Sequence, residues 1–329
     1  MTRTAGVVLI AGAALVAVIL GLGLGATAIS PSEVWAGLIH GDAGSALIIR
    51  DIRAPRVLLA FLVGGALGVS GAGLQAVVRN PLADPYLLGL SGGAGLGAVT
   101  AMAWRPLSPW AVPLAAFVGA LAAIALVYRL AVVAGRRLDS RILLLAGVAV
   151  GAFAAAIMTA ILTLSPATEL RNAFLWLLGG FSAASWRATG IFAVYAILPL
   201  GILLVRARTL DLLALGEEAA EYLGADVERG KRMVLVAASL LTAASVAVCG
   251  MIGFVGLVVP HLTRRLVGSV HRPLLPVVFL AGGTLLVAAD ALARTVARPV
   301  ELPVGVVTAL VGVPVFALLL RRSGPGGET

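Results

Sequence analysis

Charged residues, lysine, cysteine and aromatic residues are all scarce in this sequence. Charged residues make up 12% of the 329 positions, about half of the quarter that soluble domains carry. The single cysteine, Cys249, excludes an internal disulfide and lies in an apolar run, as expected of a small buried residue. His40, His261 and His271 share no metal-ligand spacing, and no Gly-x-Ser-x-Gly or His-Glu-x-x-His motif is present. This composition and these absences argue against a soluble enzyme.

Long apolar blocks take the place of the missing polar residues. Hydrophobic residues make up 60% of the chain, the mean hydropathy is +1.08, and blocks such as 6–28 and 112–134 are long enough for membrane helices. The first block exceeds the roughly 7 to 15 apolar residues of a cleaved signal, so we interpret it as a span. Basic residues are scattered between the blocks without aromatic neighbours, which favours membrane topology over nucleic-acid binding. The sequence predicts an all-α polytopic membrane protein, with residues 1–329 forming a single transmembrane domain.

Charges, prolines and turn signals divide the chain into about ten predicted transmembrane helices. They are residues 6–28, 57–78, 86–103, 112–134, 142–164, 189–205, 233–250, 252–266, 275–292 and 304–320, of which the eighth is short for a span. A cytoplasmic N-terminus places 16 of the 24 lysines and arginines inside and eight outside, as the positive-inside rule requires. Both termini are therefore predicted to lie in the cytoplasm.

The chain between the fifth and sixth spans is too short to cross the membrane. Ser165, Pro166 and Glu169 are helix start signals, and Gly179 with Gly180 are stop signals. These residues predict a short external helix at the mouth of whatever the bundle encloses.

The two halves of the chain resemble each other weakly. Residues 70–75, followed by Asn80 and Pro81, are similar to residues 249–254, followed by Pro260 and His261. The spans that contain these runs point in opposite directions, so the repeat is inverted, as is typical of transport folds. We expect a first repeat at about 53–165, a second at about 229–322, and a cytoplasmic loop at 206–232 between them.

No residues in this chain supply an energy source for transport. The segment 224–232 is the closest approach to a phosphate loop, but it has five residues between its glycines and Arg232 where a Ser or Thr is needed. Asp290 is the only carboxylate well within a predicted span, and Arg294 on the same helix face can neutralise it. ATP hydrolysis is therefore expected on a separate subunit. An ion-coupled secondary transporter is the alternative, and a receptor or scaffold that transports nothing is a third.

The longest polar stretch contains a predicted amphipathic helix at 215–224, closed by Gly224. Leu215, Ala219, Tyr222 and Leu223 form one face, and Glu217, Glu218 and Glu221 form the other. It is either a solvated loop helix or a helix that docks into a cytoplasmic partner.

Several motifs, in order along almost the whole chain, resemble the permease subunits of ABC importers for iron chelates and cobalamin. They are Arg53-Ala54-Pro55-Arg56, residues 71–75 leading to 80–85, Leu88-Gly89, residues 215–224, 253–257 with Pro260-His261, 271–276 and 301–305. The resemblance implies ten transmembrane helices in the inner membrane of a bacterium or archaeon, and a dimer around a central path. It also implies two ATPase subunits that bind ATP and Mg, and an external substrate-binding protein. No cofactor is expected on this chain itself.

The resemblance also assigns roles to individual residues. Arg53, Arg56 and Arg294 match external arginines that pair with carboxylates of the binding protein; headgroup anchoring, or pairing of Arg294 with Asp290, is the alternative. The cytoplasmic gate maps to Asn80, Leu82, Asp139 and Ser140, although the family's cobalamin permease has small hydroxyl residues where this chain has Asp139. The coupling helix maps to Glu217, Glu218, Ala220, Glu221, Leu223 and Gly224.

The implied cargo is a bulky metal chelate. A ferric siderophore stands first, followed by haem and cobalamin, because of how common each is in the family. A path lined by small and apolar residues suits weak binding during passage and leaves selectivity to the binding protein. The sequence does not decide between a homodimer and a heterodimer of permeases.

Overall fold

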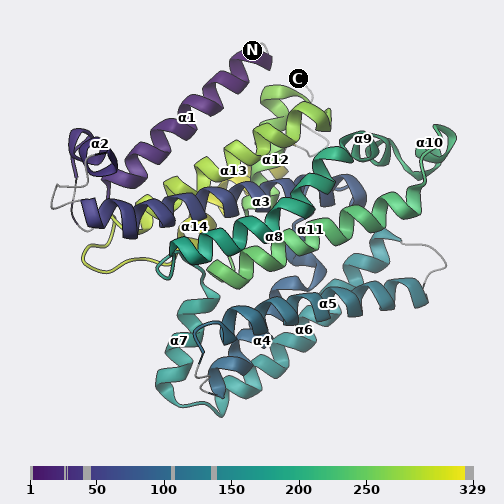
Figure 1. Ribbon diagram of the computed structural model, residues 1–329. Helices are drawn as coiled ribbons and strands as arrows, with labels where there is room; N and C mark the ends of the chain where they lie inside the picture. Colours follow the sequence, from purple (N-terminus) through teal and green to yellow (C-terminus); the bar gives the residue numbers. More distant parts are fainter. Residues whose placement is uncertain are drawn as a thin grey trace.

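The computed structural model describes residues 3–25, 27, 29–39, 46–104, 108–134 and 139–322, and this part of the chain forms helices and no strands. The predicted all-α fold is confirmed. The elements, shown in Figure 1, are α1 (Arg3–Gly23), α2 (Pro31–Ile39), η1 (Ile48–Arg53), α3 (Ala54–Val78), η2 (Pro85–Leu88), α4 (Leu90–Ala103), α5 (Ala111–Ala134), α6 (Ser140–Thr163), α7 (Ala167–Leu177), α8 (Trp186–Val205), α9 (Ala207–Leu215), α10 (Glu217–Tyr222), α11 (Val227–Cys249), α12 (Val255–Val267), α13 (His271–Ala293) and α14 (Val304–Arg322).

Each predicted span corresponds to a helix, but the helices differ in length. Among the described residues, α1, α3 together with η1, α5, α6, α8, α11 and α13 are long and apolar enough to cross a membrane. The predicted spans 86–103 and 252–266 correspond to η2 with the 14-residue α4 and to the 13-residue α12. Both short helices follow a non-helical segment. In each case this segment and the helix after it together take the place of one full-length membrane helix.

The predicted external helix is present as α7, and α2 is a helix that the sequence analysis missed. α2 begins with a reciprocal cap, because the carboxylate of Glu33 accepts from the backbone N–H and hydroxyl of Ser30 at 2.9 and 2.8 Å. The hydrogen bond from the Ser30 backbone, and then that from its hydroxyl, hold the pKa of Glu33 below its usual value. The signal was Ser-Pro-Ser-Glu at residues 30–33.

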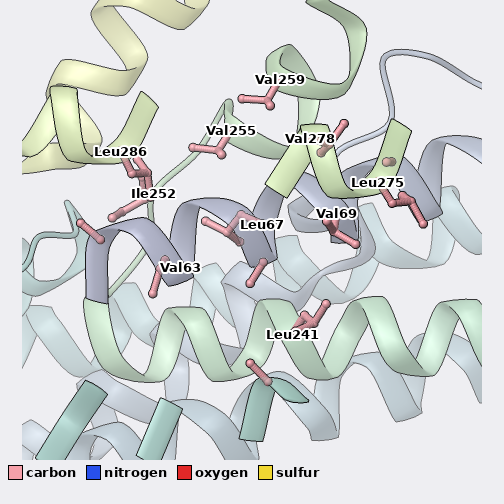
Figure 2. Packing of buried hydrophobic residues seen from close by; sticks show 14 of the residues in the cluster. Val63, Leu67, Val69, Leu241, Ile252, Val255, Val259, Leu275, Val278 and Leu286 are labelled. Atoms are coloured by element: carbon pink, nitrogen blue, oxygen red, sulfur yellow. The ribbon is translucent and has the colours of Figure 1, made fainter. Parts of the chain in front are cut away.

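The centre of the bundle is a pair of antiparallel helices, α3 and α11. The Ser70 hydroxyl donates to the Ala238 carbonyl at 2.8 Å, whereas one turn further along α3, Gly73 faces Val234, which lies earlier on α11. Most residues of both helices are buried. Figure 2 shows residues of α3 such as Leu67 packed between α11 and the α12–α13 side of the bundle.

The packing of the central helices supports the inverted repeat. α3 packs against α13 and α12 from the second half, and α11 packs against α5 and α4 from the first half. Each central helix is therefore held by the short helix and the following long helix of the opposite half. The exact repeat boundaries stay predictions.

Two pairs of glycines let α3 approach its neighbours backbone to backbone. A Cβ on Gly64 would collide with the carbonyl of Gly282 in α13, and a Cβ on Gly282 would collide with that of Gly64. Likewise, a Cβ on Gly71 would collide with the carbonyl of Gly256 in α12. Lipid supplies no hydrophobic drive between helices, so close contact through small residues takes its place.

Candidate translocation and coupling site

Each half of the chain contains a non-helical break, residues 79–84 between α3 and η2 and residues 250–254 between α11 and α12. The two breaks meet inside the bundle. α3 ends at Arg79, which has a left-handed backbone (φ 54°), and α11 ends at Gly250 (φ 70°). A second left-handed residue, Phe254 (φ 69°), precedes α12. The hydroxyl of Tyr86, in η2, accepts a hydrogen bond from the Ile252 N–H at 3.1 Å. This bond places the first break in direct contact with the second.

Gln75 joins the two breaks through its side-chain amide, which is buried. Nε2 donates to the carbonyl of Ala83 in the first break at 3.3 Å, and to the carbonyls of Gly256 and Leu257 in α12 at 3.1 and 3.3 Å. Oε1 accepts from Arg264 at 2.5 Å. Both ends of the amide are therefore bonded, as a buried polar group requires. Gln75 was not predicted as a site residue, although a polar residue late in an apolar span is a functional signal.

The predicted gate residues lie around the end of α3. The Asn80 side chain accepts from the Leu82 N–H at 2.9 Å and closes the turn after α3. Ser140 Oγ donates to the Val77 carbonyl at 3.2 Å, which brings the start of α6 against the last turn of α3. Asp139 is exposed and caps α6 by accepting from the N–H of Arg141 at 2.7 Å. The structure thus brings Asn80, Leu82 and Ser140 to one region, and it gives Asp139 a capping contact; their gating roles stay predictions.

The cap explains why an aspartate suits position 139. Ser, Thr and Asp are among the best N-cap residues, since each offers an oxygen to the free N–H groups of the first turn. An exchange between a small hydroxyl residue and Asp139 therefore preserves the start of α6.

The predicted amphipathic helix at 215–224 begins two residues later than expected. Leu215 is the last residue of α9, Gly216 (φ 113°) separates it from the six-residue α10, and Gly224 (φ 80°) follows α10 at the expected end of the segment. Ala220 is buried, whereas Glu218 and Glu221 are exposed. The apolar side chains do not pack on the bundle: Leu215, Tyr222 and Leu223 are 66, 91 and 62% exposed. Exposed large apolar residues that gather on a polar segment are typical of an interaction surface.

Glu217 links this segment to both central helices. Its Oε1 lies 2.6 Å from Nζ of Lys231 in α11 and 3.7 Å from Nη2 of Arg79 at the end of α3. Lys231 is 2% exposed, and a buried ammonium group needs a counter-charge. The link therefore connects α10 to α11 and to the residue immediately before Asn80. Lys231 is the only lysine in the sequence, but its position alone does not predict this partner.

The predicted external arginines share the opposite end of the bundle with α7, far from α10 in Figure 1. All three are buried: Arg53, Arg56 and Arg294 are 4, 8 and 4% exposed. In the isolated chain, internal acceptors surround each guanidinium. Pairing with carboxylates of a binding protein stays a prediction.

Backbone carbonyls at the end of α1 satisfy Arg53. It donates to the carbonyls of Leu22 and Gly23, both at 2.8 Å, and to that of Thr27 at 2.6 Å. A cation at the C-terminal end of a helix also interacts favourably with the helix dipole. Arg53 thus holds α1 to the start of α3.

Arg56 and Arg294 share the buried carboxylate of Asp290. Arg56 lies 2.9 Å from Asp290 and 3.0 Å from Glu301, and Arg294 lies 2.9 Å from Asp290. The alternative pairing of Arg294 with Asp290 is thus present. Arg294 also donates to the Gly21 carbonyl of α1 at 2.9 Å. We call Arg53, Arg56, Asp290, Arg294 and Glu301 the anchor cluster; its role in docking a binding protein stays a prediction.

A cavity of about 500 Å³ lies beside the anchor cluster. Its walls include Arg56 and Glu301, Trp176 of α7, Phe181, and Cys249 at the end of α11. It is the place among the described residues where α7, the second break and the anchor cluster meet. In the same part of the chain, no three His, Cys, Asp or Glu side chains lie close enough together to hold a metal ion.

The ends of the bundle separate the basic residues as the predicted topology does. Arg79, Lys231 and Arg264 gather at the α10 end, whereas the anchor arginines gather at the α7 end. Of the basic residues counted in that topology, Arg105, Arg136 and Arg137 lie outside the described residues. Which end faces the cytoplasm stays a prediction.

The sequence and the fold both have known counterparts. A family model described as the FecCD transport family matches residues 13–322. The chain is 45% identical over 275 residues to the cobalamin import system permease protein BtuC of Halobacterium salinarum, covering 84% of this chain and 73% of that protein. It is 43% identical over 316 residues to the hemin transport system permease protein HmuU of Yersinia pestis, covering 93% of this chain and 92% of that protein.

Among solved structures, the fold is similar to a metal-chelate type ABC transporter in an inward-facing conformation. The TM-score is 0.85 and the identity 28%, over 98% of this chain and 100% of that chain. The likeness therefore covers the bundle from end to end.

Proposed function

The chain belongs to the FecCD transport family, and from this premise we propose that it is the permease of an ABC importer for a bulky metal chelate. It works as half of a dimer, takes cargo from an external binding protein, and is driven by ATP hydrolysis on separate subunits. Permease subunits of this family lack an ATPase site of their own. In keeping with that, residues 224–232 form a turn and the start of α11, where Asp226 caps the helix by accepting from the Arg229 N–H at 3.0 Å.

The observation that carries this proposal is the continuous link from an exposed apolar tip to the helix breaks. Tyr222 and Leu223 offer an ATPase subunit a surface at the α10 end, which we assign to the cytoplasm. Glu217 connects that surface to Arg79, and the turn through Asn80 follows directly. Movement of α10 on ATP binding or hydrolysis would therefore reach the gate through one ion-pair network rather than through flexible loops.

The two contacts of Glu217 differ in length and burial, and this difference suggests a mechanism. The Glu217–Lys231 contact at 2.6 Å is short and partly buried, whereas the Glu217–Arg79 contact at 3.7 Å is longer and half-exposed. A displaced α10 would carry α11 with it first and change its distance from α3. Because tightly packed helix contacts move between discrete arrangements rather than deforming smoothly, such a shift can open or close the turn at 80–83.

The cargo is a metal chelate, and selectivity lies with the binding protein. The relatives named for a cargo handle cobalamin and hemin, both metal macrocycles, and this favours those two over the ferric siderophore that family frequency alone suggests. We propose that the binding protein docks over the anchor cluster. Glu301 is its most accessible member, with a side chain that is 42% exposed.

Transport by the assembled complex tests the proposal. The permease, its cognate ATPase and its binding protein are reconstituted in vesicles, and uptake of cobalamin, hemin and a ferric siderophore is measured with ATP. Vanadate should abolish uptake, and a protonophore or sodium ionophore should not. Uptake that survives vanadate but collapses with the ionophore would establish the ion-coupled alternative. Absence of uptake for every cargo that the binding protein retains would favour a receptor or scaffold.

A variant of the gate turn sharpens the same assay. Leu82→Ala removes the side chain that follows the Asn80–Pro81 turn but leaves the Asn80 hydrogen bond to the backbone N–H intact. We expect leak or raised basal ATP hydrolysis without loss of folded protein. Leu87→Ala, at an exposed position in η2, is the control. Unchanged ATPase activity and unchanged cytoplasmic access to the path in Leu82→Ala would remove Leu82 from the gate.

A further inference from the structure

A second cavity, of about 590 Å³, lies at the α10 end of the bundle. It is enclosed by the last turn of α3, α9, the second half of α12 and the start of α13, apart from the cavity beside the anchor cluster. Arg79, Arg264 and His271 contribute to its wall, and Asp211 is the carboxylate on that wall. Four helices therefore border a space whose ionisable side chains, apart from Asp211, are basic.

Arg264 has an uncompensated charge in this wall. Its bond to the neutral amide of Gln75, at 2.5 Å, is the only hydrogen bond or ion pair found for its side chain among the described residues. A guanidinium carries five N–H donors, so this bond leaves most of them for another acceptor. Because Arg264 is partly buried, water compensates its charge less well than it would at an open surface.

The two carboxylates nearby are already engaged. Asp211 accepts from both the backbone N–H and the Nδ1 of His271, at 2.8 and 2.7 Å. Glu217 lies 2.6 Å from Lys231 and only 3.7 Å from Arg79, whose side chain is 49% exposed. Arg79 and Arg264 thus leave the cavity with an excess of positive charge.

His271 adds an independent observation. The residue is 3% exposed and lines the cavity, and its Nε2 has no hydrogen-bond partner among the described residues. The carboxylate of Asp211 fixes the proton on Nδ1, so Nε2 can become a donor if the ring takes a second proton. An anion bound in the cavity would favour that second proton through its charge.

We propose that this cavity is a binding site for a phosphate group. The group comes either from free phosphate or from the headgroup of an anionic phospholipid in the adjacent leaflet. Guanidinium groups bind phosphate through paired donors, and basic pockets between membrane helices on the cytoplasmic side suit anionic headgroups. Leu215 and Val270 on the wall are 66 and 45% exposed, which gives an acyl chain an apolar edge to follow.

A phosphate fits this wall better than a carboxylate from a partner protein. Two guanidinium groups on different helices offer more donors than the two oxygens of one carboxylate can use, whereas a phosphate group presents three or four oxygens. A carboxylate supplied by the ATPase is the competing occupant, and the experiment separates it.

Binding is measured on the full-length permease without its ATPase. Phosphatidylglycerol retention is measured by native mass spectrometry from mixed micelles that also contain phosphatidylcholine. Inorganic phosphate binding is measured by titration calorimetry in phosphatidylcholine nanodiscs at constant ionic strength. Arg264→Gln and Arg79→Gln should each weaken binding about tenfold or more, since each removes charge-assisted hydrogen bonds. Arg272→Gln, an exposed charge at the start of α13 that does not line the cavity, is the control and should bind as the unaltered protein does.

The outcomes assign the source of the phosphate. Retention of phosphatidylglycerol that free phosphate does not displace identifies the lipid, and binding of inorganic phosphate in neutral nanodiscs identifies the free anion. Arg264→Lys keeps the positive charge but loses the paired N–H donors of the guanidinium. It should bind with intermediate affinity if those paired donors contact the phosphate oxygens. Two results overturn the proposal. In one, the unaltered permease binds neither ligand, as expected if only a partner's carboxylate fits. In the other, Arg79→Gln and Arg272→Gln weaken binding equally, which would indicate general surface charge.

Discussion

The anchor cluster and the Glu217 link are both made of arginine, lysine and carboxylates, yet they are built differently. In the anchor cluster every charged group except Glu301 is almost fully buried, and Arg56 and Arg294 share Asp290 at 2.9 Å each. In the link, one buried lysine and one half-exposed arginine approach Glu217 at unequal distances. A buried, fully paired network resists change, whereas a partly solvated one can exchange partners at small cost. The comparison teaches that the α7 end is fixed and the α10 end is adjustable.

The largest effect is expected in the anchor cluster, from Asp290→Asn. This change removes the charge of the carboxylate that the buried Arg56 and Arg294 share. Breaking a buried ion pair costs about 3 to 5 kcal/mol of stability. We expect a large fall in the midpoint of thermal unfolding of the detergent-solubilised permease. Glu301→Gln, on the more exposed partner, is the matched control and should cost far less. Equal shifts for the two variants would contradict the description of Asp290 as the centre of the cluster.

The next effect is expected in the link, from Glu217→Gln. It removes the carboxylate that lies 2.6 Å from the buried Lys231. Loss of a hydrogen bond to a charged group costs about 1.5 to 3 kcal/mol, so the thermal midpoint falls less than in Asp290→Asn. Transport should fall more steeply than stability, because α10 loses its contact with α3 and α11. ATP-driven uptake and ATPase activity are measured together, with Glu218→Gln, an exposed carboxylate on the same helix, as control. If Glu217→Gln and Glu218→Gln transport equally well, the link carries no coupling.

A third, smaller effect is expected at the exposed tip, from Tyr222→Ala. The side chain is 91% exposed, so its removal should leave the thermal midpoint unchanged. A buried aromatic at an interface is worth about 2 kcal/mol, so affinity for the ATPase should fall roughly thirtyfold. Binding is measured with immobilised permease, and Tyr195→Ala, on an exposed position of α8 far along the bundle, is the control. Loss of stability with unchanged affinity would show that the tip packs on its own bundle.

The smallest effect is expected at Asp139. Asp139→Ser keeps an N-cap and should change stability by less than about 0.5 kcal/mol, whereas Asp139→Ala loses the cap at about 1 kcal/mol. Both variants are compared by thermal unfolding and by leak of cargo through the reconstituted complex. Leak in Asp139→Ser without a stability change would assign the residue to the gate; leak that follows stability would make it a cap only.

The long helices were predictable because a bilayer imposes a length and a composition. The span 112–134 coincides closely with α5, and the start and stop signals around Glu169 located α7. The inverted repeat was also visible, because its glycine-rich runs are local in sequence.

The anchor cluster was not predictable in the same way. Arg56 and Glu301 lie 245 positions apart, and only the folded bundle brings them together at 3.0 Å. The positive-inside count places Arg53 outside the membrane as an exposed charge. The count does not include the unpaired carbonyls at the end of α1, which accept hydrogen bonds from Arg53 in the folded bundle. The Glu217–Lys231 pair was missed for a related reason. The sequence shows that Lys231 is unusual, but the return of α10 against α11 depends on the turn at Gly224.

Gln75 has a consequence for how the molecule moves in time. Because each half of the bundle has its own helix break, each break would be free to move independently if nothing joined the two. The Gln75 amide is bonded to Ala83 on one side and to Gly256 and Leu257 on the other, so displacement of either segment disturbs the other. Together with the Tyr86–Ile252 hydrogen bond, this amide couples the two segments, so displacement of only one of them breaks hydrogen bonds that a joint displacement keeps. The amide therefore favours movement of both segments together and opposes states in which only one has moved.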